Sequence, residues 1–201
     1  MGIYLTADLH LGEEKVRLRW ERPWASIEEH DAALIANINA RVGADDTLYI
    51  LGDVSGLADD ARIRAWLDAI VCKNRWLIRG NHDDAAALSA PGAFVGVADY
   101  CEISADGRNF CLSHYPMLDW NKGNAYYAAH DPKAEAFMLH GHIHSRGQEV
   151  NAANARAGIL RYDVGVDANG YCPVSIGEVL GFFGYSVARP EVLAKRMEAL
   201  R

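Results

Sequence analysis

Short runs of apolar residues alternate along the chain with longer segments whose apolar residues recur every three to four positions. The short runs predict buried β-strands at residues 3–6, 47–51, 76–78, 136–139 and 159–164. Ser26 and Glu29 form a capping box that opens a helix ending at Gly43. Residues 58–70 follow the spacing of an amphipathic helix. The alternation of strands and helices predicts an α/β fold.

A β-hairpin is predicted at residues 100–113, about the turn Asp106-Gly107, because this dipeptide favours the type I′ turn of two-residue hairpins. In the register that this turn sets, Cys101 and Cys111 lie on opposite faces of the sheet. A disulfide between them is therefore not expected.

The remaining segments have weaker patterns. Residues 13–25 are charged and contain Pro23, which predicts a loop or lid, and His30 near the start of the first helix is interpreted as a surface or capping histidine. Residues 115–135 predict a long irregular cover rich in aromatic residues. A polar loop of Asn and Ala is expected before residue 159, and a short final helix from about Glu191.

Composition limits the class of protein. A chain of 201 residues, 50% of them hydrophobic and without a linker or repeat, predicts a single domain over residues 1–201. The formal charge of −7 argues against broad nucleic-acid binding, which needs a basic surface. Four cysteines without framework spacing predict reduced thiols and a cytoplasmic protein, and no membrane span or signal peptide is expected.

Candidate chemistry lies at the ends of the predicted strands, where open α/β sheets place their ligands. In chain order these ends carry Asp8-x-His10, Gly52-Asp53, Gly80-Asn81-His82-Asp83, His114 and Gly141-His142-x-His144. Oxygen and nitrogen side chains at five strand ends predict a metal site. If the last segment stays extended, His142 and His144 point the same way and serve two neighbouring ions.

In this order and spacing the residues resemble the calcineurin-like metallophosphoesterase superfamily, whose pattern DxH…GD…GNH(D/E)…H…GHxH is matched in full over residues 8–144. The chain is also similar to a small stand-alone bacterial and phage branch of that superfamily. This likeness is carried by residues 22–24, 77–83, 114–117 with Trp120, 164–167 and 173–175. Gly52-Asp53 is not followed by the Arg that many relatives carry.

The resemblance implies a four-layer αββα sandwich of two mixed β-sheets flanked by helices, the metallo-dependent phosphatase fold, with a site for two divalent ions. One ion would be held by Asp8, His10, Asp53 and His144, and the other by Asp53, Asn81, His114 and His142, with Asp53 bridging. Two divalent ions and the two carboxylates leave a local charge of +2 for an anionic substrate. The ligand types favour Mn²⁺, with Fe or Zn²⁺ as alternatives.

Mechanistically, a metal-bridging hydroxide would attack the phosphorus in line. His82, beside the ligand Asn81, is the predicted general acid, with Asp83 orienting it. The alternative is a structural histidine beside a turn.

Trp120, Tyr126 and Tyr127 are candidates for stacking on a nucleobase, and Arg22 for binding the substrate. The aromatic residues fit equally well as a lid that packs its own apolar side chains. Distal phosphates have four candidate partners, which as scattered loop charges are alternatively solvated: Arg17, Arg19, Arg22 and Lys122.

The sequence thus predicts a metal-dependent phosphohydrolase, a phosphodiesterase in preference to a monoesterase, whose partner is a small nucleotide-like phosphoester. One alternative is a non-catalytic metal-binding interaction protein of the same fold. The other is a nuclease on polymeric nucleic acid, which the acidic charge disfavours.

Overall fold

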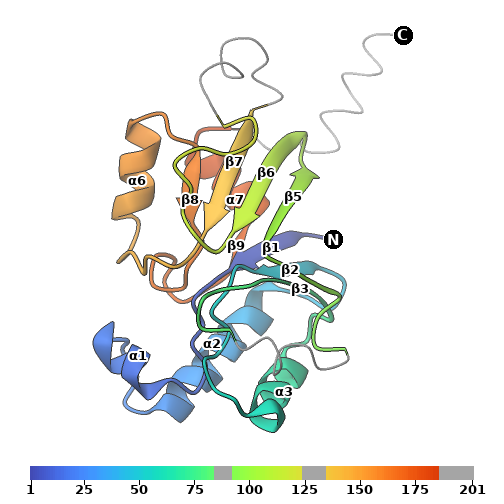
Figure 1. Ribbon diagram of the computed structural model, residues 1–201, viewed down its shortest axis with the longest axis vertical. Helices are drawn as coiled ribbons and strands as arrows, with labels where there is room; N and C mark the ends of the chain where they lie inside the picture. Colours follow the sequence, from blue (N-terminus) through green and yellow to red (C-terminus); the bar gives the residue numbers. More distant parts are fainter. Residues whose placement is uncertain (84–91, 124–134, 186–201) are drawn as a thin grey trace.

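The computed structural model describes residues 1–83, 92–123 and 135–185, which form two β-sheets flanked by helices (Figure 1). The first sheet has the order β4-β3-β2-β1-β9 and the second β5-β6-β7-β8. The strands of the first sheet are β1 (Ile3–Thr6), β2 (Thr47–Ile50), β3 (Asn74–Ile78), β4 (Gly96–Ala98) and β9 (Val174–Ser175). Those of the second are β5 (Tyr100–Ala105), β6 (Arg108–Ser113), β7 (Ala136–His140) and β8 (Arg161–Asp163). Both sheets mix parallel and antiparallel pairs, as the resemblance implies.

The described helices are α1 (Glu14–Arg19), α2 (Ile27–Arg41), α3 (Asp60–Ala69), α6 (Glu149–Arg156) and α7 (Ile176–Phe182). In Figure 1, α2 and α3 lie below the first sheet, on the side away from β5–β8. Alternation along β2 explains this arrangement, because Leu48 and Ile50 pack with Leu34 and Ile38 of α2. Among the described helices, none combines the length and apolarity needed to cross a lipid bilayer.

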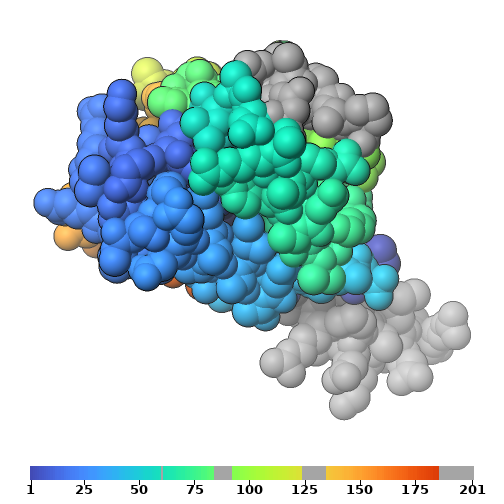
Figure 2. All heavy atoms as spheres, turned by 90° about the horizontal axis from the view of Figure 1, so that it is seen from below, coloured from blue at the N-terminus to red at the C-terminus, as the bar shows by residue number. Residues whose placement is uncertain are grey.

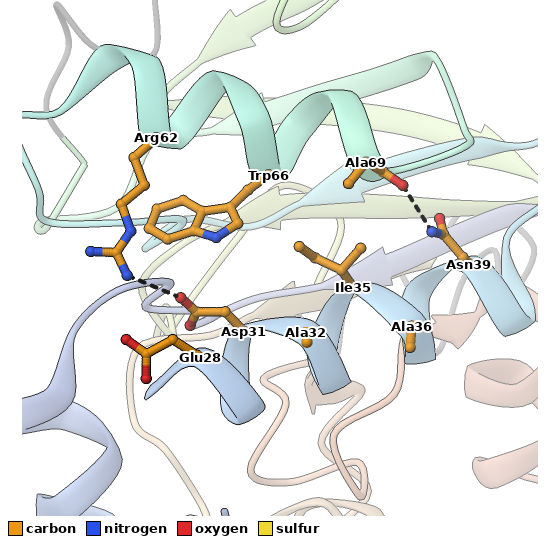
Figure 3. Close-up of a pocket in the computed structure, with 9 residues that line it drawn as sticks. All are labelled: Glu28, Asp31, Ala32, Ile35, Ala36, Asn39, Arg62, Trp66 and Ala69. Atoms are coloured by element: carbon orange, nitrogen blue, oxygen red, sulfur yellow. Dashed lines mark hydrogen bonds and ion pairs between the residues drawn. The ribbon is translucent and has the colours of Figure 1, made fainter. Parts of the chain in front are cut away.

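α2 and α3 lie side by side on the face seen in Figure 2 and line an open groove of about 550 Å³ between them (Figure 3). At one end of the groove the Asn39 side chain donates to the carbonyl of Ala69 over 2.9 Å. At the other end Arg62 lies 3.9 Å from the carboxylate of Asp31. Two polar contacts thus fix the spacing of the two helices.

Besides the core between the first sheet and its helices, a second hydrophobic core lies between the two sheets. It joins Leu5, Leu51 and Ile78 of the first sheet region to apolar residues of β6, β7 and α7, and Phe110 and Phe137 stack with ring centroids 5.3 Å apart. The strands carry side chains alternately to this core and to their outer faces, which explains why each reads as an apolar run.

The carboxyl ends of six strands meet at one edge of the molecule. β1, β2 and β3 are parallel to one another, as are β6, β7 and β8. The two sheets join there through a parallel bridge between Ala7 and Gly165 and a hydrogen bond from the Val166 N–H to the Ala7 carbonyl. Loops from both sheets are thereby brought to a single site.

The five predicted strands, the hairpin and the helices predicted at residues 26–43 and 58–70 are confirmed, with shifts of a few residues at their ends. The hairpin has the expected register, since Cys101 pairs with Leu112 and Glu102 with Cys111, and all four cysteines are free. The Ser26 hydroxyl caps α2 by accepting from the Glu29 N–H, and Ser175 opens α7.

Three expectations were wrong or incomplete. The supposed loop at residues 13–25 contains α1, and the supposed polar loop contains α6, whose Asn151 and Asn154 side chains donate to carbonyls of β8 rather than to water. The short strands β4 and β9 were not predicted. Most of the predicted cover and the final helix from Glu191 lie outside the described residues.

Candidate metal centre

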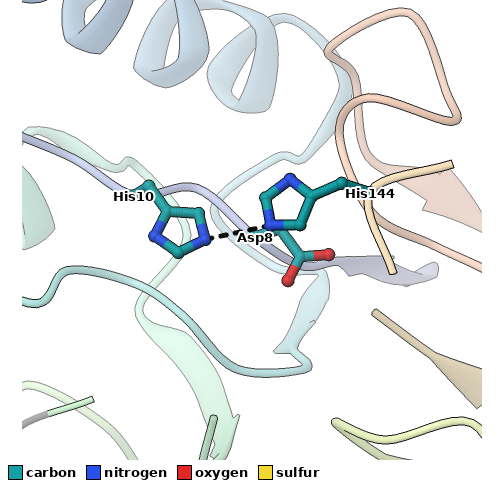
Figure 4. A group of neighbouring side chains, drawn as sticks. All are labelled: Asp8, His10 and His144. Atoms are coloured by element: carbon teal, nitrogen blue, oxygen red, sulfur yellow. Dashed lines mark hydrogen bonds between the residues drawn. The ribbon is translucent and has the colours of Figure 1, made fainter. Parts of the chain in front are cut away.

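All seven predicted ligands meet at the shared edge of the two sheets. In one group, Nε2 of His10 lies 3.2 Å from Nε2 of His144, and both rings stand beside the carboxylate of Asp8 (Figure 4). One donor atom from each of these three side chains lies within 4.8 Å of the others. This spacing allows the three side chains to share one ion.

The second group is centred on His114. Its Nε2 atom lies 3.0 Å from Oδ1 of Asn81 and 3.2 Å from Nδ1 of His142. Asp53 stands between the two groups, because its Oδ2 atom is 3.5 Å from Nε2 of His10 and 3.5 Å from Nε2 of His114. The arrangement matches the division of ligands that the resemblance implies.

Hydrogen bonds fix which ring nitrogens face the site. Nδ1 of His114 lies 2.8 Å from the Leu51 carbonyl oxygen. Because a carbonyl oxygen can only accept a hydrogen bond, Nδ1 must carry the proton and donate it. Nδ1 of His10 lies 3.0 Å from Glu13, and Nδ1 of His144 lies 2.7 Å from Asp167. In each neutral ring Nε2 therefore presents its lone pair to the site, as metal-binding histidines with a carboxylate or carbonyl partner do.

These lone pairs face one another and carboxylate oxygens, which is unfavourable unless a cation lies between them. The Asp8 carboxyl responds to the same surroundings, since burial raises its pKa well above the usual range and the nearby Asp163 raises it further; a bound cation would favour its ionised form. The donor set of carboxylate and amide oxygens and imidazole nitrogens fits divalent ions of the Mn²⁺, Fe or Zn²⁺ type.

The backbone at the site is strained. Nine described residues other than glycine have positive φ, and five of them are predicted ligands: Asp8, His10, Asp53, His142 and His144. His142 (φ 72°) and His144 (φ 47°) thus lie on a turn, which corrects the expectation of an extended segment. Their rings still reach different groups, His142 toward His114 and His144 toward His10.

Glycine is required next to two of these carboxylates. A Cβ at Gly80 would lie 2.1 Å from Oδ1 of Asp53, and one at Gly141 would lie 2.7 Å from Oδ2 of Asp8. Only glycine leaves room for the carboxylates in these positions. The glycines of the sequence pattern therefore have a direct steric role.

Arg22 was predicted to bind substrate, and the structure corrects this. Its side chain is fully buried and binds the carboxylate of Asp167, with Nη2 also donating to the Asp8 carbonyl. His30 is likewise buried rather than on the surface, between Arg22 and Asp31. Arg22 thus contacts the candidate ligands from the side away from the cleft, through Asp167 and the Asp8 carbonyl.

His82 and Asp83 are not paired. The Asp83 carboxylate accepts hydrogen bonds from the backbone N–H groups of Asp53, Val54 and Gly80, over 2.7–3.0 Å. This corrects the expectation that Asp83 orients His82. Nδ1 of His82 lies instead 3.5 Å from Oε2 of Glu13.

The predicted aromatic platform is also changed. Trp120 packs beside Cys111, Ala136 and Met138 on the outer face of the second sheet, and its Nε1–H donates to the Ala136 carbonyl at 2.8 Å. It is a packing residue, but it packs on the sheet and not, as the alternative interpretation expected, within a lid of its own apolar side chains. Tyr126 and Tyr127 lie outside the described residues.

A cleft of about 230 Å³ opens over the ligands. Its walls include His82 and three residues from α1 and its end, Val16, Arg19 and Trp20. Arg19 was a candidate for binding distal phosphates, whereas Val16 and Trp20 were not predicted as site residues. Glu13 and Asp167 were also missed as partners of ligands, although Glu13 stands three residues after His10 and Asp167 follows a strand end.

The sequence is similar to known proteins over most of its length. The family model described as the calcineurin-like phosphoesterase superfamily domain matches residues 1–165. The gene 66 protein of Mycobacterium phage D29 is 33% identical over 186 residues, which cover 83% of this chain and 88% of that protein. An uncharacterized protein of Methanocaldococcus jannaschii is 28% identical over 175 residues, covering 87% and 86% of the two chains.

A solved structure supports the fold. A protein of unknown function from Aquifex aeolicus matches with a TM-score of 0.67 and 24% identity, over 89% of this chain and 97% of that one. The family match over most of the sequence shows that the chain belongs to the calcineurin-like phosphoesterase superfamily.

Proposed function

We propose that the protein is a phosphohydrolase that uses two divalent metal ions, Mn²⁺ in the first place, to cleave small nucleotide-like phosphodiesters. The observation that carries this proposal is the position of Asp53. Its Oδ2 atom is equidistant, at 3.5 Å, from the site-facing nitrogens of His10 and His114, which belong to different ligand groups. A carboxylate in this position suits a bridge between two ions.

The first ion would be held by Asp8, His10, Asp53 and His144, and the second by Asp53, Asn81, His114 and His142. Bound ions would stabilise the charge that develops on the phosphoryl oxygens and provide a nucleophile from water at neutral pH. The protein's own part is to hold the ligands in place through Glu13, Asp167 and the Leu51 carbonyl.

His82 is the proposed general acid. Its ring lines the cleft and its side chain is 44% exposed, so that a leaving oxygen can reach it. Glu13 lies on the Nδ1 side, which leaves Nε2 to donate the proton. In this proposal Glu13 takes the orienting role that was expected for Asp83, and its position beside Nδ1 of His82 supports this.

The size and charge of the cleft support a small diester. Its volume of about 230 Å³ is below that of typical drug-sized ligand pockets, so polymeric substrates are disfavoured. Arg19 is the one Arg or Lys among the described residues that line it, so substrate charge beyond that of the reacting phosphoryl group would face this one side chain.

The free thiols are consistent with the proposed cytoplasmic location.

A phosphoester panel tests the proposal. The purified protein would be loaded with Mn²⁺, its metal content measured, and its turnover followed on nucleotide diesters, dinucleoside polyphosphates, cyclic dinucleotides and monoesters. We expect two metal equivalents and the highest kcat/KM on a small diester. Less than one bound equivalent and no turnover of any ester would support a non-catalytic protein of the same fold.

A further inference from the structure

The end of α1 is fixed to the metal centre by an aromatic contact. The indole of Trp20 stacks on the imidazole of His144 with ring centroids 4.6 Å apart and planes at 1°. Because His144 is itself held by Asp167, Trp20 has a defined position beside the ligands. The neighbouring Arg19 therefore has a defined position beside the place where the reacting phosphoryl group would bind.

Arg19 is exposed and its guanidinium lies 5.7 Å from the centroid of the Trp20 ring. Other arginines of this region have carboxylate partners: Arg17 pairs with Glu14, Arg22 with Asp167, and Arg146 with Glu21. Among the described residues, no carboxylate lies within ion-pair distance of Arg19. It is an unneutralised cation in the wall of a cleft for anions.

Arg19 is not needed at the reacting phosphoryl group if the two metal ions are bound. The ions with Asp8 and Asp53 carry a local charge of +2, which exceeds the single charge of a diester. A guanidinium presents a planar set of donors that matches a phosphate, and stacking against Trp20 limits its freedom. The geometry points to a second anionic group on the substrate.

We propose that Arg19 and Trp20 form a specificity subsite that binds an additional phosphate of a nucleotide diester. This inference rests on the proposed function, because the subsite is defined relative to the reacting phosphoryl group. The substrate class is thereby narrowed to nucleotide esters that carry a second phosphate.

Two substrates that differ in one group test the subsite. Thymidine 5′-(4-nitrophenyl phosphate) and its 3′-phosphorylated derivative share the nucleoside, the scissile bond and the leaving group. For the wild-type protein with Mn²⁺ we expect kcat/KM to be about tenfold higher for the 3′-phosphorylated ester, as for one charge-assisted contact. In Arg19→Ala this preference should disappear, and Arg19→Lys should retain part of it.

Arg146→Ala is the matched control, since Arg146 is also an exposed arginine near Trp20 but is paired with Glu21. It should keep the preference. Calorimetric binding of thymidine 3′,5′-bisphosphate and thymidine 5′-phosphate gives a readout without turnover, and Arg19→Ala should lose the tighter binding of the bisphosphate. Metal content should stay the same in all variants.

The outcomes separate the subsite from the function on which it rests. If the wild-type protein binds two metals but cleaves neither ester, the proposed function fails. If it cleaves both and Arg19→Ala slows both by the same factor, Arg19 contacts the reacting phosphoryl group and the subsite proposal is overturned. The subsite proposal is also overturned if the ratio of kcat/KM for the 3′-phosphorylated ester to that for the unphosphorylated ester is the same in wild type and Arg19→Ala.

Discussion

The guanidinium of Arg22 binds the carboxylate of Asp167 through two hydrogen bonds, from Nε to Oδ1 at 3.0 Å and from Nη2 to Oδ2 at 2.8 Å. The two residues are 145 positions apart in the sequence. Asp167 in turn lies 2.7 Å from Nδ1 of His144, and Arg22 also donates to the carbonyls of Asp8 and Leu9. One buried arginine therefore supports the side chain of one proposed ligand and the backbone of another.

Arg22→Lys should weaken metal binding. Lysine keeps the charge but loses the planar pair of donors that orients Asp167, and loss of such a partner typically lowers metal affinity about 10–100-fold. The measurement is a Mn²⁺ titration, with Arg146→Lys as an exposed control. Equal affinity in Arg22→Lys and wild type would show that the Arg22–Asp167 pair does not position His144.

Asp167 should make the metal-free protein sensitive to acid. Burial alone raises the pKa of its carboxyl, but hydrogen bonds from His144 and Arg22 outweigh burial and lower the pKa to about 2. Because the folded-state pKa lies below the ordinary value, the contribution is present above about pH 4 and is lost as the pH falls through about 2. It amounts to about 2 kcal/mol of unfolding free energy.

The test is to compare the pH dependence of unfolding free energy for wild type and Asp167→Asn, with a chelator present. Between pH 4 and 2 the wild-type protein should lose more stability than the variant. Parallel curves would mean that the Asp167 carboxyl has the same pKa in the folded and unfolded states.

The sequence was sufficient to predict that the seven candidate ligands meet, because they follow the ends of apolar strands and parallel strands bring their carboxyl ends to one edge. The α/β class followed from the alternation of short apolar runs and helical spacing. Even the hairpin register followed from Asp106-Gly107, whose φ angles of 50° and 74° suit a type I′ turn.

What could not be predicted depends on contacts between distant segments. Arg22 is an ordinary loop arginine until Asp167 is brought beside it. Trp120 lies in an irregular segment, and only the second sheet provides the outer face on which it packs. The Asn residues of α6 suggested a solvent-exposed loop, because the sequence does not show that their side chains donate to carbonyls of β8.

Glu13→Gln should affect both the metal centre and the acid. The carboxylate lies 3.0 Å from Nδ1 of His10 and 3.5 Å from Nδ1 of His82, and it accepts from the Gly56 N–H at 2.6 Å. The amide keeps the shape but removes the charge. We expect weaker metal binding together with a larger loss on esters with poor leaving groups, whereas Asp83→Asn should not produce that pattern of leaving-group dependence.

The Glu13→Gln measurement combines a Mn²⁺ titration with kcat/KM on aryl and alkyl esters. If Asp83→Asn instead reproduces the selective loss on alkyl esters, Asp83 rather than Glu13 orients the acid.

His82→Ala should keep its metals, because the seven proposed ligands do not include His82. The loss should be small for an aryl ester whose leaving group is stable as an anion. For an alkyl or nucleoside ester it should approach the roughly 10²–10⁴-fold of general acid catalysis. Comparing the two esters checks this, and an equal loss on both would show that His82 stabilises charge instead of donating a proton.

The central claim is that Asp53 bridges two ions, and Asp53→Asn tests it most directly. The buried carboxylate is replaced by an amide of the same shape, which removes one of the two anionic ligands. The measurement is Mn²⁺ stoichiometry and affinity at neutral pH, with the unfolding free energy of both metal-free proteins as a control for folding. We expect two equivalents in wild type and a joint weakening of both in Asp53→Asn; unchanged binding of two ions, or loss of one alone, would contradict the bridge.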